Sequence, residues 1–203
     1  MRKLLLTFAS LVLLGVAAPL AAAEPPTDEV AAMLAFMREE EKLAHDVYLL
    51  FSEMYAGQDA SSKIFARIAE SEQRHTDAVK GLLDEYGLPD PAAGMVPGQF
   101  VDQSLQDLYT ALVSVGESGY TEALGVGVVI EQKDMTDIVA AIELSVAYPD
   151  IVQVYSNLLA GSEHHLAAFL RVLEVAEPET ASVVGARGPG STGDEAGRHR
   201  GGM

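Results

Sequence analysis

Acidic and histidine side chains interrupt the apolar stripes of four long segments in this chain of 203 residues. In each segment, residues at alternating spacings of three and four are apolar, as on one face of an α-helix, except near the middle. Burial of a lone carboxylate is costly, so carboxylates that face one another would repel strongly unless cations lay between them. The interrupting ionisable residues are Glu41 in the first segment, Glu72 and His75 in the second, Glu131 and Asp134 in the third, and His165 in the fourth.

Metal ions are the simplest source of that positive charge. No Lys or Arg occupies a stripe position, although Lys42, Arg74 and Lys133 lie beside the stripes. Carboxylate oxygens together with imidazole nitrogens suit iron, manganese or zinc. Glu72 and His75 are three residues apart and point the same way from one helix face. This is the Glu-x-x-His element of helical bundles that hold two iron or two manganese ions.

The composition narrows the chemistry further. The chain has 13 Lys and Arg against 30 Asp and Glu, a formal net charge of -17, which argues against binding to nucleic acid or to an anionic membrane surface. It has no Cys, which excludes disulfides, thiolate metal sites, iron–sulfur clusters and cysteine nucleophiles. Its hydrophobic content of 49% is too high for a disordered chain. We therefore expect an acidic globular domain that uses oxygen and nitrogen ligands.

Four long helices must position these residues. Periodicity and capping residues predict helices over about 27–55, 61–86, 120–146 and 149–175, with a shorter one at 104–115 in the link between the second and third. Short turns make each pair of long helices an antiparallel hairpin. No segment alternates like a strand. We expect an all-α, ferritin-like four-helix bundle, in which two antiparallel helix hairpins are joined by a long crossover that contains a short helix. The alternative is an up-down-up-down bundle with an elaborated middle loop.

The two ends of the chain differ from the predicted bundle, which spans residues 24–176. Residues 1–23 combine two early cations, an apolar run and a small-residue ending, which predicts a cleaved signal peptide in preference to a membrane anchor. The mature protein is then exported, to the periplasm or the extracellular space, with no membrane association. Residues 177–203 are rich in Gly, Pro, Ser and Thr without an apolar period, which predicts a disordered tail.

Several motifs together resemble a known family. They are EEEKLAHDVY at 39–48, AESEQRH at 69–75, ALGVGVVIEQKDM at 123–135 and GSEHHLAAF at 161–169. In combination they resemble the DUF2202 family of ferritin-like proteins, within the rubrerythrin-like di-iron carboxylate superfamily, over about residues 30–175. The resemblance implies metal ligands from all four long helices, namely Glu41, Glu72, His75, Glu131 and His165.

One position departs from the usual di-iron pattern. A second Glu-x-x-His is usual on the last helix, but Ser162 stands at its first position. Asp134, one turn from Glu131, is a candidate for the missing carboxylate and would restore a set of four carboxylates and two imidazoles. We expect two metal ions, iron first and manganese or zinc as alternatives. A single ion, or a pair with one weak position, is the other interpretation.

Three residues close to the stripes each have two interpretations. Glu40 also has apolar neighbours, so Glu40 and Glu41 could exchange roles. His45 is either a partner of a metal ligand or a partly exposed surface residue. Tyr48 faces inward and is expected to be a packed core residue, with a hydrogen bond to a ligand or a radical role as alternatives.

The expected function follows from such a site. A dinuclear carboxylate centre can bind oxygen or peroxide and cycle iron between two states, so we expect oxidation of ferrous iron or reduction of peroxide. Rubrerythrins carry a Cys-rich rubredoxin segment for electron delivery, and the lack of Cys argues against peroxide reduction in that manner. The alternative is a non-catalytic metal-binding or interaction bundle whose site is incomplete or empty. A homo-oligomer is compatible with both the catalytic and the non-catalytic interpretation.

Overall fold

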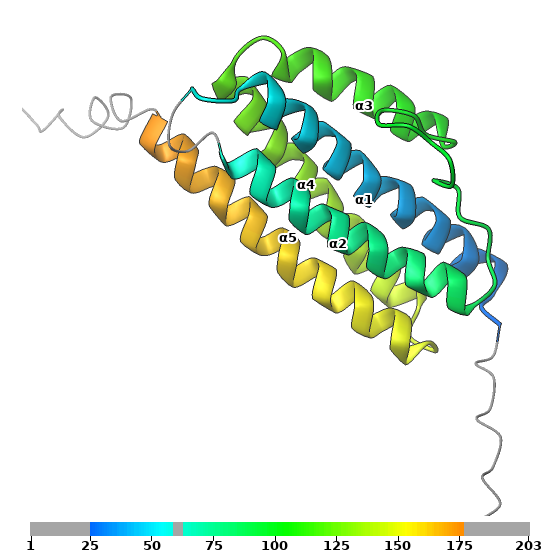
Figure 1. Ribbon diagram of the computed structural model, residues 1–203. Helices are drawn as coiled ribbons and strands as arrows, with labels where there is room; N and C mark the ends of the chain where they lie inside the picture. The colour runs from blue at the N-terminus through cyan, green and yellow to red at the C-terminus, as the bar shows by residue number, and fades with distance from the viewer. Residues whose placement is uncertain (1–24, 59–62, 177–203) are drawn as a thin grey trace, which may run out of the picture.

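Five helices occupy the parts of the chain that the computed structural model describes, residues 25–58 and 63–176 (Figure 1). In chain order they are α1 (Asp28–Met54), α2 (Lys63–Glu85), α3 (Gln103–Gly116), α4 (Tyr120–Leu144) and α5 (Pro149–Ala176). These described ranges contain no strand. The all-α prediction is therefore confirmed, including the short helix in the link. The predicted signal peptide, 1–23, and the predicted tail, 177–203, lie outside the described residues.

The long link decides which helices are neighbours. α1 packs against α2, and α4 packs against α5, as two antiparallel hairpins. α1 also contacts α4, and α2 contacts α5, so the hairpins lie side by side. α3 covers the outer side of α1 and α4 (Figure 1). Two hairpins joined by one long crossover form the ferritin-like arrangement, which confirms that prediction over the up-down-up-down alternative.

Local signals set the ends of the helices. The Thr27 hydroxyl accepts a hydrogen bond from the Val30 amide at 3.3 Å, so Thr27 caps α1. Gly87 follows α2 with a φ of 65°, a left-handed conformation that favours glycine and ends the helix. Among the described residues, no helix is both long and apolar enough to cross a membrane.

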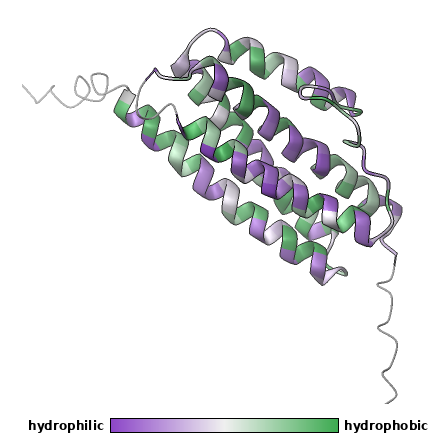
Figure 2. Cartoon of the chain, viewed as in Figure 1, coloured by the Kyte–Doolittle hydropathy of each residue, from purple (hydrophilic) through white to green (hydrophobic). Residues whose placement is uncertain are grey.

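A polar layer divides the apolar core into two clusters. One cluster is rich in aromatic residues and lies where α2 begins and α5 ends, with Phe51 and Phe65 at a ring-centroid distance of 5.5 Å. The other is mainly aliphatic and includes Leu34 and Leu158. The hydrophilic residues between them colour the middle of α1 and α2 in Figure 2. The fold therefore places a band of ionisable side chains between two dry layers.

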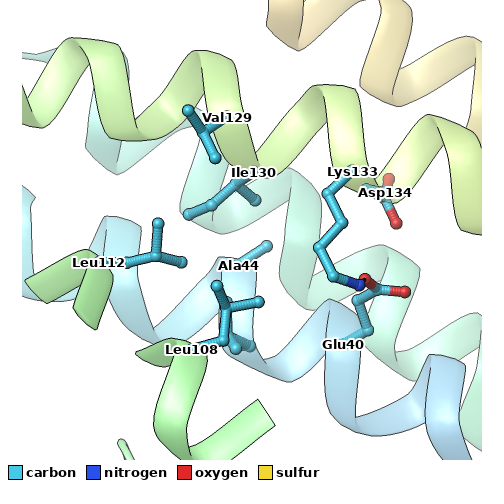
Figure 3. Close-up of a pocket in the computed structure, with 9 residues that line it drawn as sticks. Glu40, Ala44, Leu108, Leu112, Val129, Ile130, Lys133 and Asp134 are labelled. Carbon is cyan, nitrogen blue, oxygen red and sulfur yellow. Dashed lines mark hydrogen bonds and ion pairs between the residues drawn. The ribbon is translucent and has the colours of Figure 1, made fainter. Parts of the chain in front are cut away.

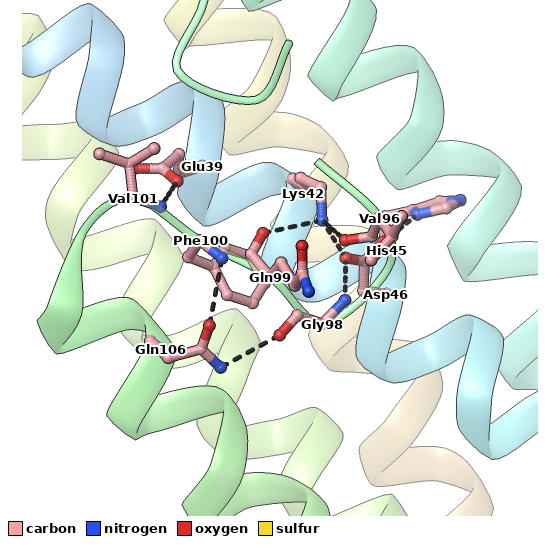
Figure 4. A network of polar contacts seen from close by, with 10 residues as sticks. All are labelled: Glu39, Lys42, His45, Asp46, Val96, Gly98, Gln99, Phe100, Val101 and Gln106. Carbon is pink, nitrogen blue, oxygen red and sulfur yellow. Dashed lines mark hydrogen bonds and ion pairs between the residues drawn. The ribbon is translucent and has the colours of Figure 1, made fainter. Parts of the chain in front are cut away.

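A second group of buried charges on α1 faces the link and not the bundle interior (Figure 4). Asp46 Oδ2 accepts a hydrogen bond from the Gly98 amide at 2.8 Å and pairs with the Lys42 ammonium. Lys42 also donates to the carbonyl oxygens of Val96 at 3.1 Å and Gln99 at 3.3 Å. These bonds satisfy backbone groups of a link segment that has no regular structure of its own.

Two more charged residues extend this attachment along α1. The Glu39 carboxylate accepts hydrogen bonds from the Val101 and Asp102 amides, the second at 3.0 Å. The Arg38 guanidinium forms an ion pair with Asp90 at 3.1 Å. We call Arg38, Glu39, Lys42 and Asp46 the link clamp. The link clamp was not predicted from the sequence, because its members fall outside the apolar stripe of α1.

Replacement of Asp46 by Ala tests the link clamp. Asp46→Ala should lower the free energy of unfolding by about 3 kcal/mol, because Lys42 would stay buried without a carboxylate partner. Asp77→Ala is the matched control, since it removes an exposed carboxylate from α2 and should cost less than about 0.5 kcal/mol. Urea unfolding followed by circular dichroism measures both. Equal effects for the two variants would contradict the clamp.

Candidate metal centre

Four helices bring the predicted ligands together inside the polar layer. Glu41 comes from α1, Glu131 from α4 and His165 from α5. Glu72 and His75 come from successive turns of α2 and share one face. The three glutamates are each 1% exposed, and the two histidines are buried as well. The structure therefore assembles all five residues that the resemblance implied.

Glu72 contacts both imidazoles. His75 Nδ1 lies 2.9 Å from Glu72 Oε2, and His165 Nδ1 lies 2.8 Å from Glu72 Oε1. The outer carboxylates complete the pattern, with Glu41 Oε2 at 3.3 Å from His75 Nδ1 and Glu131 Oε2 at 3.5 Å from His165 Nδ1. Two groups of three residues result, and they share Glu72. Within each group the ligand atoms all lie within 4.8 Å of one another.

Many of these buried atoms lack an aligned hydrogen-bond partner. They are both oxygens of Glu41, Oε1 of Glu72, and Nδ1 of His75 and His165. Buried polar atoms without partners are costly, so this number in one place calls for an explanation. Ligand atoms on one metal ion are about 3–4 Å apart, because each bond is about 2.1 Å long. The two groups are therefore compatible with a metal site after a small contraction.

The charges of the centre depend on one another. Burial raises the pKa of Glu41 to about 8 and that of Glu131 to about 7. Burial acts on Glu72 in the same direction, but the adjacent His165 and His75 outweigh it and lower its pKa to about 2. Conversely, the carboxylates outweigh burial and raise the pKa of His75 to about 10 and of His165 to about 9. In the absence of metal ions, these shifts favour, at neutral pH, a Glu72 carboxylate between two imidazolium ions.

Asp134 lies next to the two groups but belongs to neither. Its Oδ2 is 2.6 Å from the Ser162 hydroxyl, which also lies 3.0 Å from the Leu158 carbonyl oxygen. Its Oδ1 is buried and has no hydrogen-bond partner. Burial, and next the charge of Glu41, raise the pKa of Asp134 well above its usual value. The residue that departs from the di-iron pattern, Ser162, therefore contacts the carboxylate predicted to compensate for it.

Tyr48 combines two of the three roles considered for it, core packing and a hydrogen bond to a carboxylate of the centre. Its ring packs against Phe169 at a centroid distance of 5.3 Å in the aromatic cluster. Its hydroxyl donates a hydrogen bond to Glu131 Oε1 at 2.7 Å. The other oxygen of Glu131 is the one that faces His165. Tyr48 therefore fixes the orientation of one outer carboxylate.

Glu40 and His45 lie outside the two groups. Glu40 pairs with Lys133 of α4, so Glu41, and not Glu40, joins the cluster. His45 Nδ1 lies 3.0 Å from Asp46 Oδ1, which places this half-buried ring beside the link clamp. Adjacent residues on a helix point about 100° apart, so sequence alone did not separate Glu40 from Glu41.

Gly161 is a residue of the centre that sequence analysis did not single out. A Cβ atom at this position would lie 2.5 Å from His75 Nε2, much closer than an ordinary contact. The absence of a side chain therefore leaves the space that the His75 ring occupies. The sequence feature that could have identified Gly161 is its position next to Ser162, on the helix that faces the predicted Glu-x-x-His of α2.

Comparison with known proteins places the chain in a family. Residues 30–183 match the family described as "Uncharacterized protein domain (DUF2202)". The chain belongs to the DUF2202 family. A relative, "Uncharacterized protein MJ0754" of Methanocaldococcus jannaschii, is 43% identical over 150 residues, which are 74% of this chain and 78% of the relative. The predicted DUF2202 membership is confirmed.

Two solved structures are similar to this DUF2202 protein. The crystal structure of hypothetical protein MJ0754 from Methanococcus jannaschii DSM 2661 has a TM-score of 0.70 and 42% identity, and the match covers 75% of this chain and 84% of that one. The structure of a mycobacterial bacterioferritin has a TM-score of 0.61 and 15% identity, with coverage of 80% and 94%. At that identity the likeness shows the fold alone, and that fold is ferritin-like.

Removal of metal ions should make stability depend on pH. In chelator-treated protein, the free energy of unfolding should fall as pH rises from about 6 to about 10. The raised pKa values of His75 (about 10), His165 (about 9) and Glu41 (about 8) mean that the folded protein binds more protons than the unfolded one in this range. Each such proton contributes a slope of roughly 1.4 kcal/mol per pH unit. Urea unfolding at several pH values measures it.

A variant isolates the cause of this slope. Glu72→Gln removes the charge that both imidazoles face, so its profile between about pH 6 and pH 10 should be much flatter. Glu70→Gln removes an exposed charge from the same helix and should keep the wild-type slope. A wild-type profile that is flat over this range would contradict the two-imidazolium description.

Proposed function

We propose that this protein binds two metal ions, iron in first place, at the carboxylate–histidine centre and oxidises ferrous iron or reduces peroxide there. The observation that carries the proposal is the pair of buried ligand groups that share Glu72. The ferritin-like fold supports it, because this bundle type builds metal sites from side chains on facing helices. The unpartnered buried atoms support it as well.

The division of ligands between the two ions follows the two groups. One ion would be held by Glu41, His75 and Glu72, and the other by Glu131, His165 and the same Glu72. Oxygen and nitrogen ligands suit iron, with manganese and zinc as alternatives. Bound iron would supply electron exchange with oxygen or peroxide.

Asp134 is the fourth carboxylate of the proposed set. Ser162 contacts Oδ2, which leaves Oδ1 as the oxygen without a partner. Four carboxylates carry four negative charges, and two divalent ions would neutralise them fully. The set then contains the four carboxylates and two imidazoles of a dinuclear bundle site, with one carboxylate supplied from α4 where α5 carries Ser162.

The surrounding residues orient the ligands and exclude water. Tyr48 holds Glu131 by its hydrogen bond, which leaves one carboxylate oxygen directed at His165. The aromatic and aliphatic clusters above and below the polar layer keep it dry. His75 and His165 must lose a proton before they bind a metal ion, so metal binding at neutral pH should release protons.

Anaerobic loading with ferrous iron tests the proposal. We expect two ions per chain, proton release into a weak buffer, and on admission of air a transient visible absorbance with protein-dependent oxygen uptake. Glu72→Gln should lower the rate of oxygen uptake at least tenfold, because it removes the ligand shared by both ions. Glu70→Gln, two residues away and exposed, is the control.

The outcomes separate the alternatives. A Glu72→Gln variant that takes up oxygen like the wild type would reject oxidation at this centre. Metal binding without oxygen uptake would support the alternative that this is a non-catalytic metal-binding protein. No binding of iron, manganese or zinc would mean an empty site, held together by the imidazolium–carboxylate contacts alone.

Replacement of Asp134 tests the fourth carboxylate. Asp134→Asn should weaken binding of one of the two ions by about 10- to 100-fold, because the amide keeps the shape but not the charge. Ser162→Ala should have a much smaller effect, since it removes only the contact to Oδ2. Isothermal titration with Mn²⁺ measures both. A wild-type stoichiometry of one ion per chain would reject the dinuclear site.

We also propose that the protein acts outside the cytoplasm. The support is the pattern of residues 1–23, with early cations, an apolar run and a small-residue ending. Mass spectrometry of the protein isolated from its own cells should find a mature chain that begins at Glu24. A chain that retains its first 23 residues would reject this proposal.

A further inference from the structure

Lys133 joins two carboxylates on the side of the centre that faces α1 and α3. Its ammonium pairs with Glu40 of α1 and with Asp137 of its own helix. The exposed fractions of the side chains are 36% for Lys133, 32% for Asp137 and 6% for Glu40. A positive charge therefore lies between a solvent-facing carboxylate and a buried one, as Figure 3 shows for Lys133 and Glu40.

A small pocket adjoins this ion pair. Glu40, Lys133 and Asp134 line it together with apolar side chains from α1, α3 and α4 (Figure 3). Its volume is about 20 Å³, enough for one water molecule or one ion without its hydration shell. Asp134 also lies next to the metal centre, so the pocket adjoins both the centre and the half-exposed Lys133.

Two carboxylate oxygens of residues beside this pocket have no hydrogen-bond partner. They are Oε2 of Glu40 and Oδ1 of Asp134, and both are buried. Lys133 joins Glu40 to Asp137, and Glu40 and Asp134 both line the pocket. Acidic groups therefore follow one another from Asp137 at the surface through Glu40 to Asp134, next to the centre.

An apolar passage for oxygen would not require these groups. Most of the pocket wall is apolar, but an uncharged molecule gains nothing from two unpaired anionic oxygens or from an ammonium beside them. A divalent cation does, because each carboxylate offsets part of the cost of removing its hydration shell. The charges beside the pocket therefore favour a divalent cation, and not oxygen, as the species that reaches the centre from this side.

We propose that Asp137, Glu40 and Asp134 form an entry route for divalent cations to the centre, and that the Lys133 ammonium occupies the position of a cation in transit. The proposal rests on the metal binding proposed above. Lys133 has a flexible four-carbon stem and remains partly exposed, so it can turn to solvent when a cation reaches Asp137. The cation then passes to Glu40 and to Oδ1 of Asp134. While no cation is present, Lys133 compensates the buried charge of Glu40.

Stopped-flow measurement of anaerobic Co²⁺ binding to the metal-free protein tests the route. Glu40→Gln should slow Co²⁺ uptake about tenfold but leave the number of bound ions and the affinity at equilibrium unchanged. Lys133→Met should speed uptake several-fold, because the competing ammonium is absent. Glu70→Gln and Lys80→Met are matched controls, since they alter an exposed and a partly exposed charge on α2, away from the route, and should stay within twofold of the wild-type rate.

A conservative variant and a second position keep the test decisive. Glu40→Asp retains the charge and should restore at least half of the wild-type rate. Should Glu40→Gln fail to fold by circular dichroism, Asp137→Asn changes a half-exposed residue of the same route and should also slow uptake.

Three results would overturn the entry route. Wild-type rates in both Glu40→Gln and Asp137→Asn, with Co²⁺ bound normally, would reject the route and leave the centre intact. A lower number of bound ions in Glu40→Gln at an unchanged rate would make Glu40 a ligand and not a transit residue. No Co²⁺ binding by the wild-type protein would reject the proposed function together with the route.

Discussion

The rest of the structure depends on how the buried carboxylates of the centre are compensated. Glu41, Glu72, Glu131 and Asp134 come from three helices and meet in a layer that apolar clusters isolate from water on both sides. Burial and the mutual repulsion of these groups favour the protonated forms of Glu41, Glu131 and Asp134 unless positive charge lies beside them. Two imidazoles supply part of the compensation by facing Glu72 directly. The packing of the four helices around the polar layer therefore depends on charge compensation as well as on apolar burial.

α1 contributes charged side chains to several of the buried polar contacts. Within four consecutive residues it directs Glu39 to the link, Glu40 to Lys133, Glu41 to the centre and Lys42 back to the link. All four are buried, because α2, α4, α3 and the link pack around this stretch of the helix. A charged run that would ordinarily lie in solvent is here distributed among three separate polar contacts.

Helical periodicity predicted the fold and singled out the ionisable residues that meet in the polar layer, because each of those residues repeats the apolar spacing of its own helix. Periodicity identifies a face of a helix but not what lies opposite it. For this reason the sharing of Glu72 by two imidazoles and the pairing of Glu40 with Lys133 required the structure. The link clamp was missed for a related reason: Lys42 and Asp46 are buried only because the irregular segment around Gly98 covers them, and that segment has no pattern to predict.

Because Glu72 contacts both His75 and His165, the charge on either histidine affects the pKa of the other. When His75 loses its proton, Glu72 has one positive neighbour fewer and attracts the remaining proton on His165 more strongly. A metal ion bound on one side, as proposed, would have the opposite effect, because it would share the Glu72 carboxylate and weaken the hold of Glu72 on the proton of the other imidazole. The second histidine would then lose its proton more easily when a second ion binds. This chain of events is a thermodynamic coupling, so each position must influence the other to the same extent.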